Sequence, residues 1–92
     1  MQIDRSMTEL GGRLARARAD LRILEEQLLF ALDTLEEAKT RMLVAETPLA
    51  DREFRIARED YDRLERQHSE TSERITELQR EQDRLLDGLL NA

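Results

Sequence analysis

His68 is the only histidine in the 92-residue sequence, so it is the first candidate for acid–base chemistry near neutral pH. Glu65 precedes it by three residues, which is the Glu-x-x-His spacing of di-iron sites in helical bundles. Such a site needs the same pair on a second helix, and the sequence has no second histidine. No serine or threonine is spaced to form a relay with His68, and the absence of cysteine excludes thiol nucleophiles and cysteine-type zinc sites. We therefore predict a packed or half-exposed histidine, no catalytic residues, no metal site, no cofactor and no enzymatic activity.

Three acidic residues, Glu46, Asp51 and Glu53, lie close together around the only proline, Pro48. The simplest interpretation is that they are solvated side chains at a turn. Asp51 would then lie in the first turn of a helix, where the helix dipole favours negative charge.

Residues 50–59, which read ADREFRIARE, give these acids a second interpretation. This stretch resembles the segment after the tip of the bacterial transcription-cleavage factors, which insert a coiled-coil hairpin into the secondary channel of RNA polymerase. The resemblance implies an alternative function, a tip-first regulator of RNA polymerase or another nucleic-acid machine that uses the three acids. It covers these residues only, and those factors also carry a globular C-terminal domain for which this sequence has no counterpart.

The elements that would position these side chains follow from two seven-residue repeats. Apolar residues recur at alternating steps of three and four, which is the pattern of a coiled-coil seam. The first seam consists of Ile3, Met7, Leu10, Leu14, Ala17, Leu21, Leu24, Leu28, Ala31, Leu35, Ala38, Met42 and Ala45. The second consists of Ala50, Phe54, Ala57, Tyr61, Leu64, His68, Thr71, Ile75, Leu78, Gln82, Leu85 and Leu89.

Pro48 separates the two seams, and a proline cannot lie inside a helix without breaking it. It also disfavours the helical conformation at Thr47, which can then cap a second helix that begins at Pro48. Continuing the first seam would place Arg52 and Glu59 on it, whereas the second seam restarts at Ala50. We predict an all-α, antiparallel two-helix coiled-coil hairpin in a single domain, residues 1–92. The expected helices cover about 2–45 and 48–90, with the turn near 46–47.

Two registers of the hairpin bring seam residues opposite one another. In the first, opposed residue numbers sum to 92, so that Ala38 faces Phe54 and Ala31 faces Tyr61, and large side chains meet small ones. In the second they sum to 99, and Ala31 faces His68. The first is preferred because it matches a tight turn. We also expect six acid–base pairs four residues apart on the helix surfaces. They are Glu9–Arg13, Glu37–Arg41, Asp51–Arg55, Glu59–Arg63, Asp62–Arg66 and Glu70–Arg74.

Several large apolar residues lie off both seams. An isolated hairpin would leave them in water, and a contiguous apolar surface indicates an interaction site. They are Ile23, Leu29, Phe30, Leu32, Leu43 and Val44 in the first helix, and Leu49 and Ile56 after the turn, with Leu86 and Leu90 as a smaller group. We expect self-association into a dimeric four-helix bundle, because two helices alone bury little surface. The alternative is a groove for the helix of a partner protein, and the two functions are compatible.

The composition narrows the possible fold classes, binding partners and cellular locations. Charged residues make up 39% and aromatic residues 3%, which suits long helices better than a rounded globular core. The net charge of −6, with both signs interspersed, argues against direct nucleic-acid binding, and the basic run Arg13, Arg16, Arg18 and Arg22 is interpreted as a solvated face. No signal region or apolar run of ~20 residues is present, so we expect a cytoplasmic protein without membrane contact.

Two further features are ambiguous. Gly11 and Gly12 interrupt a helical pattern, either because the first turns fray or bend or because another backbone approaches closely. A third functional class, the small secreted helical-hairpin family, is ranked last because its Trp-x-Gly turn is replaced here by Glu-Thr-Pro-Leu at residues 46–49. The leading hypothesis is a non-enzymatic interaction, scaffold or regulatory protein that acts through the apolar stripe and the hairpin tip.

Overall fold

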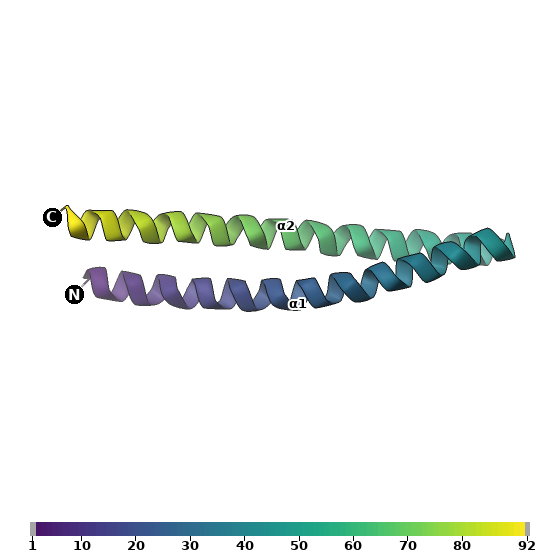
Figure 1. The fold of residues 1–92 in the computed structure, drawn as a ribbon, viewed down its shortest axis with the longest axis horizontal. Helices are drawn as coiled ribbons and strands as arrows, with labels where there is room; N and C mark the ends of the chain where they lie inside the picture. Colours follow the sequence, from purple (N-terminus) through teal and green to yellow (C-terminus); the bar gives the residue numbers. More distant parts are fainter. Residues whose placement is uncertain (1, 92) are drawn as a thin grey trace. The chain divides into compact units, whose positions relative to one another are not determined.

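The computed structural model describes the backbone of residues 2–91 and the side chains of residues 4–91. The predicted seam residue Ile3 is not among the residues with described side chains. Two long helices, α1 (Gln2–Ala45) and α2 (Pro48–Leu90), account for nearly all of them, and no strand occurs in residues 2–91. The fold is an all-α helical hairpin, and the predicted helix bounds are confirmed (Figure 1).

The hairpin packs as two compact units. Residues 2–22 and 69–91 form one, called the end unit, and Ile23–His68 form the other, called the tip unit. The boundary falls where the seam of α2 becomes polar, at His68 and Thr71.

The chain reverses direction over two residues with complementary roles. Glu46 has a φ of 51°, the left-handed conformation that commonly ends a helix, and its N–H donates to the Met42 carbonyl at 3.3 Å. The Thr47 hydroxyl oxygen accepts a hydrogen bond from the Ala50 N–H at 3.2 Å, which caps α2. The predicted N-cap at Thr47, with Pro48 as the first helical residue, is therefore confirmed.

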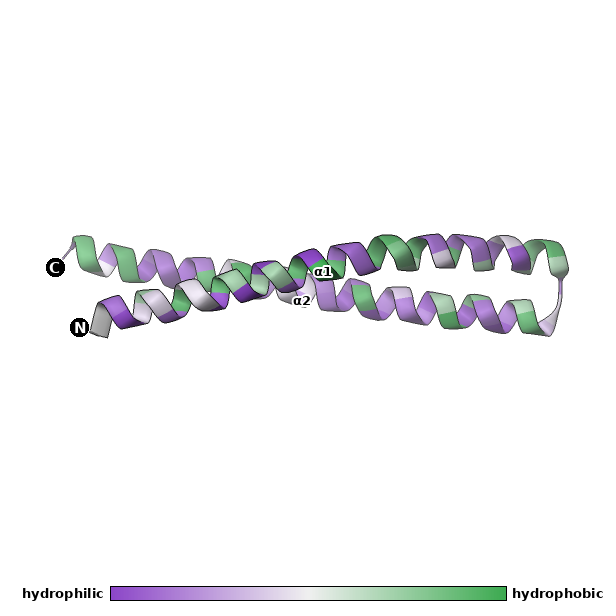
Figure 2. Ribbon diagram, turned by 90° about the horizontal axis from the view of Figure 1, so that it is seen from below, coloured by the Kyte–Doolittle hydropathy of each residue, from purple (hydrophilic) through white to green (hydrophobic). Residues whose placement is uncertain are grey.

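The predicted seams match the residues that the fold withdraws from solvent. Every seam residue from Met7 to Met42 and from Ala50 to Leu85 is buried or half-buried, whereas Ala45 and Leu89 are exposed. Hydrophobic residues recur along both helices between hydrophilic ones (Figure 2). The buried apolar residues are Leu10, Leu14, Ala17, Ala38, Ala50, Ala57 and Leu78. Within the described residues no large side chain is less than 2% exposed, because two helices can cover a seam but cannot enclose it.

The register with sums of 92 holds in each unit. In the end unit, Leu14 and Ala17 belong to one cluster with Leu78 and Ile75, their partners in this register, whereas sums of 99 would place Leu21 opposite Leu78. In the tip unit, the Arg41 Nε and a Glu53 carboxylate oxygen lie 3.5 Å apart, whereas sums of 99 would place Glu53 opposite Glu46 in the turn.

The six predicted ion pairs four residues apart are wrong. None of them lies within 4.0 Å among the described side chains. Arg41 pairs across the hairpin with Glu53 instead of Glu37, and Arg63 pairs with Asp60 at 3.2 Å instead of Glu59. Long exposed side chains gain little from any one pairing, so small differences in position decide which pair forms.

Gly11 and Gly12 lie on an open surface of α1. The helix runs through both residues without interruption, so fraying does not explain them. A Cβ at either position would meet no atom within 4 Å, so no backbone of the described residues approaches closely.

Replacing Glu46 by glycine should stabilise the hairpin, because glycine adopts a positive φ without steric cost. Glycine also raises the conformational entropy of the unfolded chain, which cancels part of this gain. We therefore expect the free energy of unfolding, measured in urea titrations, to rise by up to about 1 kcal/mol. Glu46→Ala is the matched control, since it removes the carboxylate but keeps the Cβ. Equal effects of the two variants would show that the backbone conformation of Glu46 contributes nothing.

Leu14→Ala should be costly because Leu14 is only 3% exposed. We expect a loss of about 2–5 kcal/mol in the free energy of unfolding. Leu28→Ala, at a half-buried seam position, should cost clearly less in dilute solution. Thermal melts of both variants measure the two losses. Equal losses for Leu14→Ala and Leu28→Ala would contradict the difference in burial between these two positions.

Candidate protein-interaction surface

The apolar residues predicted to lie off the seams are exposed, and eight of them belong to the tip unit. Their positions on the helices turn them away from the seam, so the described residues cover them only in part. Exposure ranges from 36% at Leu32 to 76% at Phe30 and 80% at Val44. The eight are Ile23, Leu29, Phe30, Leu32, Leu43, Val44, Leu49 and Ile56.

Helical geometry places five of these residues in two rows on α1. Ile23, Phe30 and Val44 are separated by multiples of seven and share one side of α1, and Leu49 and Ile56 are likewise seven apart on α2. Leu29 and Leu43 each precede a residue of the first row, so they lie about 100° further round the helix. The sequence pattern predicts one apolar stripe, whereas in the hairpin the exposed residues of α1 lie in two rows.

Two residues of the first row, Ile23 and Phe30, border a groove of about 620 Å³ within the tip unit. Its deeper wall comes from the seam residues Ala31, Ala57 and Leu64, and Ile23 and Phe30 stand beside them. Alanine on both helices leaves room where larger seam residues would fill it. The groove is also lined by Glu26, Gln27, Thr34, Asp60 and Arg63. An apolar floor with a polar border is suited to the side chains of another protein.

The three acids of the alternative interpretation lie at the turn and just after it. Glu46 lies in the turn and Asp51 in the first turn of α2, while Glu53 pairs with Arg41. No group of three or more metal-ligating side chains is placed to hold a metal ion in the part of the chain that the structure describes.

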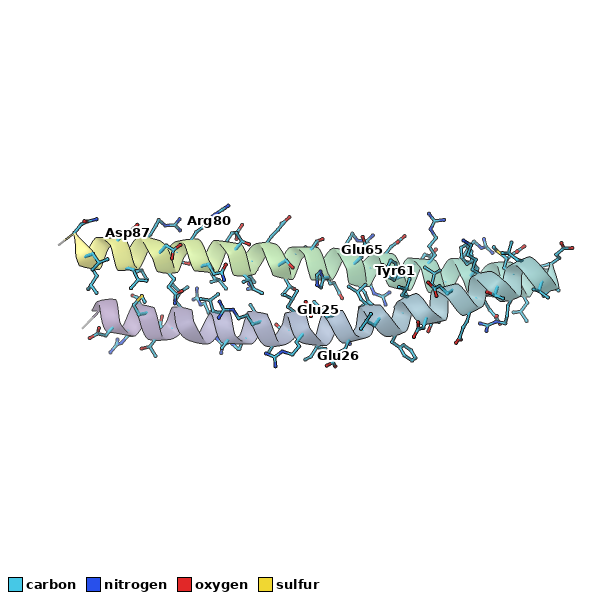
Figure 3. The ribbon with its side chains drawn as sticks, viewed as in Figure 1. Glu25, Glu26, Tyr61, Glu65, Arg80 and Asp87 are labelled. Carbon is cyan, nitrogen blue, oxygen red and sulfur yellow. The ribbon has the colours of Figure 1, made fainter. Side chains whose placement is uncertain are left out.

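His68 is a half-buried seam residue. Its Nε2 atom lies 3.5 Å from a Glu25 carboxylate oxygen, and its side chain is 31% exposed. Glu25 lies on the side of α1 that faces α2, whereas Glu26 points away from it (Figure 3). When the imidazole is protonated, it forms an ion pair with the Glu25 carboxylate.

A second groove, in the end unit, was not predicted from the sequence. It has a volume of about 500 Å³ and is lined by Arg13, Arg16, Ala17, Asp20, Arg74 and Leu78. We call it the Arg groove. The sequence shows the basic run in α1, and the structure adds that Arg74 of α2 lines the same groove. The available signal is that Arg13 and Arg74 each directly precede a seam residue, Leu14 and Ile75, so both flank the same side of the seam.

Neither helix has, among the residues described, a stretch long and apolar enough to cross a membrane. Comparison of the chain with protein-family models, with curated proteins and with solved structures gives no match.

Phe30→Ser should leave the stability of the isolated hairpin unchanged within about 0.5 kcal/mol, because the ring is 76% exposed. Phe54→Ser is the matched control, since Phe54 is half-buried on the seam opposite Ala38. We expect that control to lose about 2 kcal/mol or more. Both effects are measured in urea titrations at a protein concentration too low for self-association. A large loss for Phe30→Ser would show that its ring packs within the hairpin.

Proposed function

We propose that this chain is a non-enzymatic coiled-coil interaction protein of the cytoplasm, with a scaffold or regulatory role. It would act by associating with a second copy of itself and by binding a partner helix. The observation that carries this proposal is the set of eight exposed apolar side chains in the tip unit, two of which border a groove. Exposed apolar surface of this extent is typical of interaction sites.

The energetics are compatible with a dimer. Fully burying a side chain of this size contributes about 1.5–3 kcal/mol. A dimer that covers the four side chains further from the turn in each copy, Ile23, Leu29, Phe30 and Leu32, covers eight in all. Because these side chains are already partly buried, this would contribute on the order of 10 kcal/mol, against an association cost of about 4–15 kcal/mol. Because these terms are of similar size, polar complementarity would decide the affinity and the orientation.

The shallow seam also supports self-association. Its buried residues are alanines and a few leucines, and the larger seam residues of the tip unit, such as Phe54 and Tyr61, remain half-buried. A four-helix bundle would cover more of this surface than one hairpin can. The residues nearest the turn, Leu43, Val44, Leu49 and Ile56, would remain for a partner helix.

No observation favours the alternative of a tip-first regulator of RNA polymerase or another nucleic-acid machine. Glu53 already pairs with Arg41, so one of its three acids is engaged within the hairpin. The apolar surface is therefore the better-supported basis for function.

Ile23→Ser combined with Phe30→Ser should abolish self-association, because both side chains border the groove of the tip unit. Equilibrium sedimentation at micromolar concentration should show a dimer for the unmodified protein and a monomer for this variant. Circular dichroism checks that both proteins are equally helical.

The matched control is Leu86→Ser combined with Leu90→Ser, which removes two exposed apolar side chains from the end unit. This control should remain dimeric. An unmodified protein that is monomeric under these conditions would refute self-association. A control variant that dissociates as fully as the test variant would show that the tip unit has no special role.

A further inference from the structure

Five of the eight exposed apolar side chains of the tip unit lie on one side of the hairpin. Ile23 and Phe30 of α1 line the groove of the tip unit together with Arg63 of α2. Residues a multiple of seven apart share one side of a helix, so apolar residues at such distances from Phe30 or Arg63 also border the groove. They are Val44 on α1 and Leu49 and Ile56 on α2. We call this side of the tip unit the groove face.

A strip of polar side chains lies between the two apolar rows of the groove face. Thr34 of α1 and Asp60 of α2 line the groove, and Arg41 and Glu53 lie seven residues from them, nearer the turn. The Arg41 Nε and a Glu53 carboxylate oxygen lie 3.5 Å apart across this strip. The middle of the groove face therefore carries both signs of charge.

The charges of α1 disfavour a contact between two copies of this helix. Residues 25–37 contain five acids and no base, so only acids would meet where this segment faced its own copy. Residues 55–67 of α2, which lie opposite this segment in the register with sums of 92, contain four arginines and four acids. The α2 helix of a second copy is therefore a better neighbour for α1 than a second α1.

A two-fold axis along the tip unit produces this pairing. It turns the groove faces of two copies toward each other, with α1 of each over α2 of the other and both turns at the same end. This rotation keeps every residue at its own level along the axis, so the two copies cannot slide past one another. The register of the hairpin then determines the contacts, because each α1 residue faces the residue of the other copy whose number gives a sum of about 92.

The apolar rows are complementary in this arrangement. Val44 faces Leu49 of the other copy near the turn, where these side chains are 80% and 66% exposed in one hairpin. Phe30 faces Arg63 of the other copy, and a guanidinium group stacks favourably on an aromatic ring. Each of these contacts occurs twice, because the two-fold axis repeats it.

The central strip is complementary as well. Arg41 and Glu53 of both copies come together around the axis, where the four charges alternate in sign. At the border of the contact, Glu26 faces Arg66 of the other copy. Asp33 faces Glu59 there, so one favourable border pair offsets one unfavourable pair. The groove face is thus complementary to itself, which favours a second copy as its occupant.

A two-fold axis across the hairpin lacks this complementarity. It would set each helix against its own copy, with the turns at opposite ends. With the axis at Phe30, Arg63 meets Arg63, and with the axis at Glu37, two carboxylates meet. An axis halfway between them brings Asp60 close to its own copy, and an axis nearer the turn leaves Phe30 uncovered. Like charges or uncovered apolar surface therefore disfavour this orientation.

We propose that two copies of this chain associate through their groove faces about a two-fold axis along the tip unit, with α1 of each copy over α2 of the other. The contact is isologous, so it closes as a dimer and does not extend into a fibre. This inference rests on the self-association proposed above and changes the side chains that it covers. Val44, Leu49 and Ile56 are covered in place of Leu29 and Leu32.

Disulfide formation between variants with one cysteine each tests the orientation. The chain has no cysteine of its own. When Val44→Cys and Leu49→Cys are mixed in a glutathione redox buffer, the disulfide between the two variants should exceed that of either variant with itself at least about tenfold. The reason is that position 44 faces position 49 of the other copy and lies away from its own counterpart. Intact mass spectrometry of the unreduced protein distinguishes the three products.

The matched control is a mixture of Phe30→Cys and Val44→Cys. These two positions face one another between copies only if the axis runs across the hairpin at Glu37. Their mixed disulfide should not exceed the disulfides of each variant with itself. All three positions are exposed, so circular dichroism should show equal helicity for the variants and the unmodified protein.

Glu37→Leu should strengthen the dimer. Glu37 lies in the same row as Phe30 and Val44 and faces Ile56 of the other copy, so the carboxylate is the one mismatch between the apolar rows. Equilibrium sedimentation should show dimerisation at least about tenfold tighter for this variant. Glu36→Leu is the matched control, because it makes the same chemical change outside the groove face and should leave the affinity unchanged.

The outcomes separate this inference from the proposed function. A mixed disulfide between positions 44 and 49, with a gain in affinity for Glu37→Leu alone, supports the arrangement. A mixed disulfide between positions 30 and 44 would overturn the orientation but would still support self-association. A dimer that forms neither mixed disulfide, or that gains equally from Glu36→Leu and Glu37→Leu, would overturn the groove face as the contact. A monomeric unmodified protein would overturn both proposals.

Discussion

The structure depends on a reversal of the chain at Glu46 and Thr47. Pro48 prevents one continuous helix, Thr47 caps the second helix, and Glu46 adopts the left-handed conformation that ends the first. Since only two residues separate the helices, the register is set there. A shift of one heptad would place Glu53 opposite the turn and would lose its pairing with Arg41.

Two helices impose a limit that shapes the rest of the molecule. Each can bury only the narrow side that faces the other, and residues 2–91 contain no third element that could cover what remains. The described seam is therefore half-buried along most of its length, with alanine at many of its most buried positions. Alanine allows close approach of the helices but leaves grooves beside them, and alanine lines both the groove of the tip unit and the Arg groove.

The exposed surface must then carry the specificity of any interaction. Apolar side chains are concentrated in the tip unit, and unpaired arginines line a groove of the end unit. Apolar burial is not directional, so it can drive association without selecting an orientation. Charged side chains can select an orientation, because opposite charges attract and like charges repel.

The sequence by itself determined the helices, their ends and their seams. Periodicity, proline and capping residues act within a few positions of the chain, so the seams, the Thr47 cap and the exposure of Phe30 and Val44 could be predicted. The tertiary structure alone decided which side chains meet across the hairpin. Arg41 pairs with Glu53 and not with Glu37, Arg74 joins Arg13 beside the same groove, and the apolar stripe divides into two rows. These contacts join residues far apart in sequence, so they depend on the register and the side-chain conformations, which a linear pattern does not contain.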